Sequence, residues 1–199
     1  MTHACTMTSL SSQYRIIAVC TGNICRSPMA ELMLAEAIEA ADLAGVVVDS
    51  AGTTAYEAGR PIDPRAARRL TANSISSDLH VAREWRPEWF QERDLILALD
   101  VDHFGWLQQA APDSAALAKI RMLRSFDPAV EGRDPLDQGI EDPWYGGHAD
   151  FDVTWNLIHA ALPGIVAHVR SELGLRRRPG GLQAGGNPPT AQHPVRSIS

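Results

Sequence analysis

Cysteine is scarce in this sequence of 199 residues, and long apolar runs are absent. Three cysteines, two of them only five positions apart at Cys20 and Cys25, exclude the disulfide framework of a small secreted protein. No apolar run approaches the roughly 20 residues that span a bilayer. Residues 1–13 lack the basic and apolar regions of a signal peptide. We therefore expect a cytoplasmic protein without integral membrane association, and export without a signal stays open.

Basic residues are also few in the body of the chain. Of the 18 Lys and Arg residues, four lie within 176–199 and none within 1–13, so residues 14–175 carry 14 basic groups against all 24 acidic ones. This formal charge of −10 argues against a nucleic-acid partner, because binding the phosphate backbone needs clustered Lys and Arg. The run Arg176–Arg178 is interpreted as a solvated helix end rather than as a binding site for an anionic partner.

One segment unites several residue types that bind phosphate. Residues 20–27 read Cys-Thr-Gly-Asn-Ile-Cys-Arg-Ser and follow the apolar run 16–19. Gly22 and Asn23 readily adopt positive φ, and such a turn lets successive N–H groups converge on an anion. We expect Ser27 to cap the following helix and Pro28 to begin it, which points the positive end of the helix dipole into the same hollow. The segment thus predicts a cradle for a phosphate-sized dianion.

Cys20 and Arg26 are the candidate reactive groups of this cradle. A helix N-terminus and a neighbouring cation lower the pKa of a cysteine from about 8.5 to roughly 3.5–7.5, so we expect Cys20 to be a nucleophilic thiolate. The alternative, a small buried residue closing a strand, does not explain the Gly-Asn turn or the arginine. Arg26 offers a planar set of donors that matches two oxygens of a phosphoryl group.

The leaving group must receive a proton, and the water that later attacks must lose one; a single carboxyl can serve both steps. The sequence has four Asp-Pro pairs, at residues 63–64, 127–128, 134–135 and 142–143. Only Asp142 is followed by aromatic residues, Trp144 and Tyr145, which can flank an aryl substrate. Asp142 is therefore the predicted general acid, and the other three fit turns or helix caps.

The segment 20–27, continued by Pro28-Met29-Ala30-Glu31, resembles the signature of the low-molecular-weight protein tyrosine phosphatases, and the resemblance extends over residues 14–175. It implies Cys20 as nucleophile, Arg26 as phosphate clamp, Asp142 as general acid, and the N–H groups of residues 21–26 as transition-state donors. Segments 50–53 and 80–83 also resemble family segments, and segments 121–128 and 161–164 resemble the actinobacterial branch. The expected loop-supporting residues are Asn23, Ser27, Ser50 and His80.

The resemblance further implies a reversible disulfide between Cys20 and Cys25 that protects the nucleophile from over-oxidation. From the residues alone, Cys25 could equally be a packing residue beneath the loop. The chemistry requires no metal and no organic cofactor.

The predicted partners are phosphotyrosyl proteins, with phosphate or another oxyanion in the active site. Tyr56, Trp144 and Tyr145 could form the walls of a slot for a phenyl ring. Ile24 occupies a position that looks to be threonine in the related protein-arginine phosphatases, and it cannot accept a hydrogen bond from a guanidinium. The complete set of candidate phosphate- or substrate-binding residues is Thr21, Gly22, Asn23, Ile24, Cys25, Ser27, Tyr56, Trp144 and Tyr145.

Four other functions are compatible with parts of this pattern. A protein-arginine phosphatase on the same scaffold stays open. An arsenate reductase needs further cysteines downstream, and none follows Cys25. A non-catalytic phosphoprotein-binding module would be expected to lose Cys20 or Asp142. A cysteine protease would not need Arg26 or the Gly-Asn turn.

Apolar periodicity predicts an α/β fold in one three-layer domain. The predicted strands are 15–19, 46–48, 94–99 and 119–123, and the predicted helices are 29–41, 65–71, 102–109 and 150–173. The last is one long helix if it tolerates Pro163-Gly164, and a kinked or split one if it does not. Strands separated by helices favour a parallel sheet, for which we expect the flavodoxin-like order 2-1-3-4 with helices on both faces. Residues 1–13, with Cys5, form a predicted disordered leader, residues 14–175 the phosphatase domain, and residues 176–199 a Pro/Gly-rich disordered tail. We expect a monomer.

Overall fold

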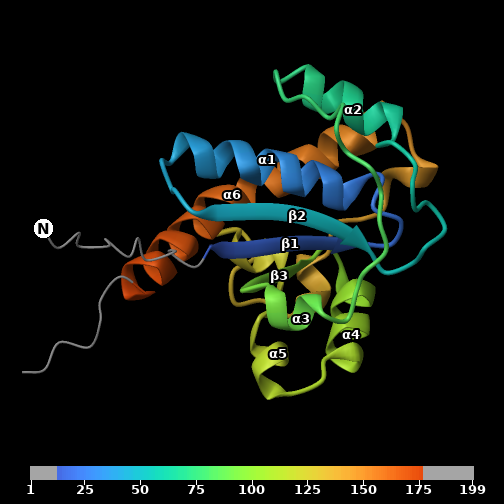
Figure 1. Cartoon of the computed structure of the whole chain (residues 1–199). Coiled ribbons are helices and arrows are strands. Elements are labelled where there is room, and N and C mark those ends of the chain that lie inside the picture. The colour runs from blue at the N-terminus through green and yellow to red at the C-terminus, as the bar shows by residue number, and fades with distance from the viewer. Residues whose placement is uncertain (1–12, 177–199) are drawn as a thin grey trace, which may run out of the picture.

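Four parallel strands form the centre of the computed structural model, which describes residues 13–176. The strands are β1 (Tyr14–Cys20), β2 (Val46–Gly52), β3 (Leu95–Ala98) and β4 (Ile120–Met122). Their order in the sheet is β2-β1-β3-β4, and every pairing is parallel (Figure 1). The predicted topology is confirmed.

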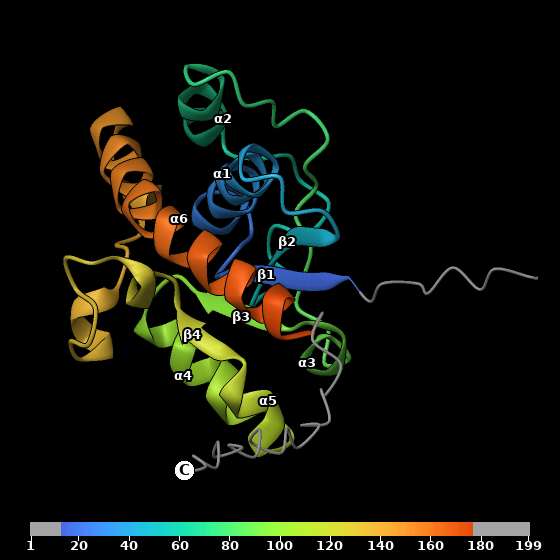
Figure 2. The same cartoon turned by 90° about the vertical axis from the view of Figure 1, so that its left-hand side faces the viewer.

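Helices cover both faces of this sheet (Figures 1 and 2). On one side lie α1 (Arg26–Ala40), α2 (Pro64–Thr71) and α6 (His148–Arg176), and on the other lie α3 (Trp89–Glu92), α4 (Val101–Ala110) and α5 (Ser114–Ala118). Side chains of β1 alternate between the two cores: Ile16 and Ala18 join the core under α1 and α6, whereas Ile17 and Val19 join the core under α3 and α4. This alternation follows from the two-residue period of a strand, and it explains why β1 is apolar on both faces.

The helix boundaries differ from the predicted ones in two informative places. Helix α1 begins at Arg26, two residues before Pro28, which was expected to begin it, so its first turn contains Arg26 and Ser27 of the segment 20–27. Helix α6 continues through Pro163 and Gly164 without interruption, and it therefore remains one helix. A Cβ at residue 164 would collide with the backbone oxygen of Phe126, in the 3-10 helix η1 (Leu123–Phe126), so Gly164 lets these two elements pack closely. The short helices α3 and α5 were not predicted.

The carboxyl ends of the strands gather at one edge of the sheet, where three loops meet. The loop 21–25 connects β1 to α1, Asp100 follows β3, and residues 139–147 precede α6 and include the 3-10 helix η3 (Pro143–Tyr145). A second 3-10 helix, η2 (Pro135–Gln138), lies earlier in that connection. Ligands of open parallel sheets bind at this edge, so the fold brings the loop of Cys20 to the expected place.

Within residues 13–176, no helix combines the length and the apolar character that crossing a membrane requires. Apart from Gln13 and Arg176, the predicted leader and tail lie outside the described residues, as do Cys5, Arg177 and Arg178. Their predicted disorder stays a prediction.

Candidate active site

The loop after β1 is held against the end of β2 by main-chain contacts. Thr53 N donates to Cys20 O over 2.8 Å, and Thr54 N donates to Thr21 O over 3.1 Å. A Cβ on Gly52 would lie 2.5 Å from Thr21 O, closer than real Cβ atoms come to a backbone oxygen. Glycine at position 52 therefore permits the close approach of β2 that fixes the loop.

Asn23 sits at the centre of a buried hydrogen-bond network inside the loop. Its φ is 58°, in the left-handed region that the sequence predicted for this residue. Its amide nitrogen donates to Ser27 Oγ over 2.9 Å and to Ser50 Oγ over 2.7 Å, while its amide oxygen accepts from the N–H of Arg83 over 2.9 Å. Every polar atom of the Asn23 side chain is thus used to maintain the turn.

Two expectations about this loop were wrong. The N-cap of α1 is Cys25 rather than Ser27, and no side chain caps the helix. Ser27 is instead fully buried, and its hydroxyl lies 3.0 Å from Cys20 Sγ and 3.3 Å from Ala51 O. Gly22 does not have a positive φ. A side chain at position 22 would instead be crowded, because its Cβ would lie 3.0 Å from Glu57 Cγ.

His80 and Ser50 each contact Asn23 directly, and both also contact Glu31, a residue for which the sequence predicted no role. His80 Nε2 donates to Asn23 O over 2.8 Å, and its Nδ1 lies 3.6 Å from Glu31 Oε2. The same carboxylate oxygen accepts from Ser50 Oγ over 2.5 Å. Glu31 on α1 therefore joins the two side chains that contact Asn23.

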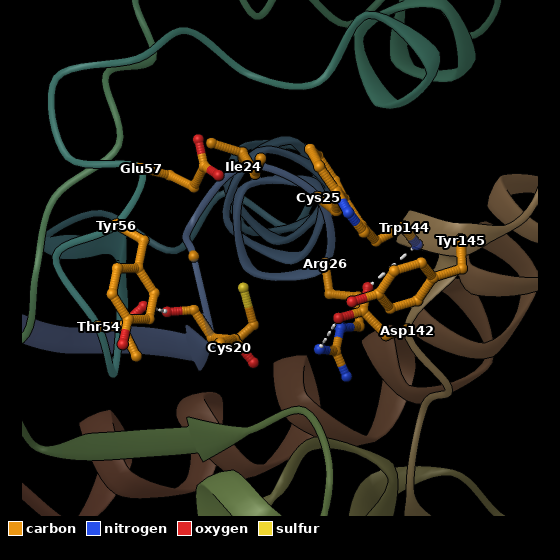
Figure 3. Close-up of a pocket in the computed structure, with 12 residues that line it drawn as sticks. Cys20, Ile24, Cys25, Arg26, Thr54, Tyr56, Glu57, Asp142, Trp144 and Tyr145 are labelled. Atoms are coloured by element: carbon orange, nitrogen blue, oxygen red, sulfur yellow. Dashed lines mark hydrogen bonds and ion pairs between the residues drawn. The ribbon is translucent and has the colours of Figure 1, made fainter.

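Cys20 lies at the floor of a pocket with a volume of about 180 Å³ (Figure 3). The loop contributes Thr21, Gly22, Ile24 and Cys25 to its lining, and Arg26 and Asp142 complete the polar side. Asn23 and Ser27 do not line it, because both side chains are fully buried in the network described above.

Arg26 is a buried cation whose guanidinium is held by two carboxylates. The residue is 3% exposed. Its Nη1 donates to Asp100 Oδ2 over 2.5 Å and to the backbone oxygen of Ile140 over 3.1 Å, and its Nη2 donates to Asp142 Oδ2 over 2.7 Å. Its Nε is buried without a hydrogen-bond partner among residues 13–176. An unpaired buried donor beside Cys20 suits an anion.

Asp142 is placed at the pocket by the loop that contains η3. Its Oδ1 accepts from the N–H of Trp144 over 3.2 Å, so Asp142 is the N-cap of the short helix and Pro143 is its first residue. Arg65 on α2 holds this loop, since its Nη1 donates to the backbone oxygens of Trp144 and Gly146 over 3.1 and 2.8 Å.

Arg65 is in turn oriented by Asp63, which also caps α2. Asp63 Oδ1 accepts from the N–H of Arg65, and the two side chains form an ion pair of 2.9 Å. Burial alone would raise the pKa of Asp63, but the hydrogen bonds and the charge of Arg65 outweigh it, and the pKa is lowered. Sequence reasoning assigned Asp63 to a turn or cap and gave Arg65 no role.

Aromatic side chains form two sides of the pocket. Tyr56 lies on one side, and Trp144 and Tyr145 lie on the other, with the sulfur of Cys20 between them (Figure 3). Tyr56 and Tyr145 are 87% and 93% exposed, so they form the rim, and Trp144 is less exposed. Thr54 and Glu57 also line the pocket, and neither was predicted.

Cys25, which lines this pocket, is a buried free thiol. Burial raises its pKa above the ordinary value, and nearby negative charges, those of Asp63 and Cys20 first, raise it further. Its thiol is therefore protonated at neutral pH, and the redox role remains a prediction. Among residues 13–176, no group of three or more His, Cys, Asp or Glu side chains could hold a metal ion.

Comparison with known proteins places this chain in one family. The family model described as low molecular weight phosphotyrosine protein phosphatase matches residues 15–175. The low molecular weight protein-tyrosine-phosphatase of Streptomyces coelicolor is 44% identical over 161 residues, which are 80% of this chain and 96% of that protein.

Solved structures also share the fold, and two of them are informative here. A protein tyrosine phosphatase from Entamoeba histolytica with Hepes in the active site has a TM-score of 0.73 at 26% identity, over 80% of this chain and 99% of that one. The YwlE arginine phosphatase of Bacillus subtilis, solved as a mutant with a phosphorylated active-site serine, has a TM-score of 0.68 at 26% identity, over 79% of this chain and 97% of that one. The fold, the phosphate loop and these relatives agree, and the chain therefore belongs to the low molecular weight phosphotyrosine protein phosphatase family of enzymes.

Proposed function

We propose that this enzyme hydrolyses phosphotyrosine in proteins through a cysteinyl-phosphate intermediate and releases inorganic phosphate. One observation carries the proposal: a single pocket unites the sulfur of Cys20, the guanidinium of Arg26 and the carboxyl of Asp142. Asp142 comes from a segment 116 residues after Arg26, so the fold must bring them together. Nucleophile, anion clamp and proton donor are the three groups that this chemistry requires.

In the first step, the thiolate of Cys20 attacks phosphorus in line with the departing phenol. The S–P bond forms, the P–O bond to tyrosine breaks, and Asp142 transfers its proton to the phenol oxygen. Arg26 and the N–H groups of the loop stabilise the equatorial oxygens. Because Arg26 Nη2 holds Asp142 in this structure, we infer that phosphate oxygens replace the carboxyl on the guanidinium and free it to face the leaving group.

In the second step, Asp142 takes a proton from water, which attacks phosphorus and breaks the S–P bond. The Ser27 hydroxyl, 3.0 Å from Cys20 Sγ, can donate its single proton to the sulfur and so stabilise the departing thiolate. The likeness to YwlE supports a covalent intermediate, because the active-site serine of that mutant is phosphorylated.

Phosphotyrosine is favoured over phosphoarginine by the lining of the pocket. Tyr56, Trp144 and Tyr145 offer aromatic surface to a phenyl ring. Ile24 lines the same pocket and provides no acceptor for a guanidinium. The likeness to an arginine phosphatase keeps that activity as the alternative. Phosphotyrosyl proteins are thus the proposed partners, and the cytoplasm is the proposed location.

The substrate is tested with three peptides of one sequence that carry phosphotyrosine, phosphoserine or phosphoarginine, assayed for phosphate release in the presence of EDTA. We expect hydrolysis of the phosphotyrosyl peptide with at least tenfold preference in kcat/KM. A preference for phosphoarginine would replace the substrate and keep the chemistry, whereas no hydrolysis of any peptide would contradict the proposed function.

The nucleophile is tested with Cys20→Ser. A serine hydroxyl in this loop is far less ionised than a thiol, so we expect turnover to disappear while inorganic phosphate still binds, as measured by calorimetry. Circular dichroism controls for folding. Turnover that survives the substitution would remove Cys20 from the mechanism.

A further inference from the structure

His103 is a buried side chain that lies between the phosphate loop and the buried arginine, and the mechanism above does not use it. It belongs to the first turn of α4, directly behind the carboxyl end of β3. Only 3% of the residue is exposed. Buried polar atoms generally have specific partners: Nε2 of His103 has a hydrogen-bond partner, and Nδ1 lies beside a carboxylate.

The first partner is the residue that follows the nucleophile. A hydrogen bond of 2.9 Å joins His103 Nε2 to Thr21 Oγ1. Thr21 begins the loop, and its backbone oxygen is one of the acceptors that tie the loop to β2. The bond therefore attaches the start of the loop to α4, on the other face of the sheet from α1.

The second partner is Asp100, the N-cap of α4. His103 Nδ1 lies 2.8 Å from Asp100 Oδ1, a contact of ion-pair length rather than a well-aligned hydrogen bond. The same oxygen accepts from the N–H of His103 over 3.0 Å. The other oxygen, Oδ2, accepts from Arg26 Nη1 over 2.5 Å. Asp100 thus divides its two oxygens between the histidine and the arginine.

The charge state of Asp100 agrees with this division. Burial alone would raise the pKa of the carboxyl, but His103, and after it Arg26, outweigh burial and the pKa lies well below its usual range. Asp100 is therefore an anion at neutral pH. It contacts Arg26 from a different direction than Asp142, which comes from the loop before α6.

We propose that His103 is a positioning residue that keeps the phosphate loop and the guanidinium of Arg26 in register, by bonding Thr21 on one side and Asp100 on the other. The inference rests on the proposed function. The loop amides and the guanidinium must meet the same phosphoryl group, and contacts from the start of α4 reach both the loop and the guanidinium. The chain Thr21–His103–Asp100–Arg26 sets the distance between them. Asp100 remains on Arg26 during turnover, while Asp142 exchanges with phosphate.

Substitutions at His103 can remove its contact with Thr21 and its contact with Asp100 separately. The amide of Asn occupies the position of Nδ1 and retains the contact with Asp100, whereas the amide of Gln reaches the position of Nε2 and retains the contact with Thr21. We expect His103→Ala to lower kcat/KM for a phosphotyrosyl peptide by roughly tenfold or more, because small displacements of catalytic groups slow reactions strongly. His103→Asn and His103→Gln are each expected to lose less.

Inhibition by vanadate shows whether a His103 variant loses activity because the site is displaced or only because the protein is less stable. Vanadate adopts the five-coordinate geometry of the transition state, so its inhibition constant is expected to rise in proportion to the loss of kcat/KM across the three variants. All assays are run well below each melting temperature. His168→Asn is the matched control, a partly buried histidine near Tyr14 that contacts none of the pocket residues and is expected to leave vanadate inhibition unchanged.

A double-mutant cycle tests the hydrogen bond between His103 and Thr21. Thr21→Val removes the hydroxyl without changing the shape, and Thr21→Ser, which keeps a hydroxyl, is expected to lose less. If His103 acts through Thr21, Thr21→Val combined with His103→Asn lowers kcat/KM no further than either alone. Additive losses would overturn the proposal, as would variants that melt earlier but bind vanadate like the wild type. Failure of the proposed function would look different, because the wild type itself would then not hydrolyse phosphotyrosine.

Discussion

At the scale of single residues, the two carboxylates on Arg26 differ in how they are held. Asp100 is fixed by the backbone and the ring of His103, whereas Asp142 contacts Arg26 and its own short helix. Asp142 is also the more exposed of the two. The more weakly held carboxyl is the one that the proposed reaction has to move.

Asp142→Ala should slow substrates according to their leaving groups. Phenyl phosphate needs a proton donor, so we expect its kcat to fall by about 10²-fold or more. p-Nitrophenyl phosphate has a far better leaving group and should lose much less in the same step. Burst kinetics separate this step from hydrolysis of the intermediate. An equal loss for both substrates would exclude Asp142 as the acid.

Asp63→Asn should alter how stability depends on pH. Asn still caps α2, so the substitution removes mainly the ion pair with Arg65. Because the pKa of Asp63 in the folded state lies below the ordinary value of 3.8, its contribution is present above that pH and is lost as the pH falls through the folded pKa. The difference in unfolding free energy between wild type and variant should be constant above about pH 5 and shrink below 3.8. Urea denaturation from pH 3 to 7 measures it, and a difference that grows in acid would contradict the assignment.

The sequence predicted site residues that lie within one short segment better than site residues that come together only when the chain folds. The spacing of Cys20 and Arg26 and the turn at Asn23 are local features, and the structure shows them in one pocket or loop. Asp100 and His103 contact each other locally, but their contacts with Arg26 and Thr21 have no local signal, because those two residues lie on other elements. The predicted cap at Ser27 failed for the same reason: a buried network competes for its hydroxyl.

At the scale of elements, the long helix α6 depends on one close contact. Gly164 allows the backbone oxygen of Phe126 to approach the helix axis. A proline in the preceding position does not end the helix, since packing outweighs local preference. The sequence predicted a long helix over residues 150–173, within α6, but not this contact, which depends on the position of η1.

Gly164→Ala and Gly174→Ala form a matched pair on this helix. Alanine is a better helix former than glycine by about 1 kcal/mol. At position 174 nothing lies within 4 Å of the added Cβ, so we expect stability to rise by up to about that amount. At position 164 the Cβ meets backbone, and we expect a net destabilisation of about 1–3 kcal/mol. Urea denaturation compares the two, and stabilisation by both would show that η1 moves freely.

At the scale of the whole molecule, the site depends on the parallel arrangement of the strands. Chain segments that are more than 100 residues apart meet because the strands end at one edge. The sheet order could be predicted from the alternation of strands and helices, since right-handed crossovers leave few topologies. Helices α3 and α5 could not, because they are only four and five residues long, little more than one helical turn, which is too short for an apolar periodicity to show.

Tungstate should stabilise the entire domain, because binding at the junction of several elements favours the folded state. At one hundred times its dissociation constant a ligand contributes about 2.7 kcal/mol, which for a domain of this size raises the melting temperature by roughly 5–10 °C. Differential scanning fluorimetry measures the shift. In Arg26→Ala we expect the shift to vanish, and an unchanged shift there would place the anion elsewhere.

The exposure of the pocket rim has a consequence for how this enzyme can diversify. Tyr56 and Tyr145 have little contact with the rest of the protein, and exchanging such exposed side chains typically changes stability by less than about 0.5 kcal/mol. Gly52 and Asn23 have no such freedom. New substrate preferences can therefore evolve at the rim one substitution at a time, while the chemistry beneath is inherited unchanged.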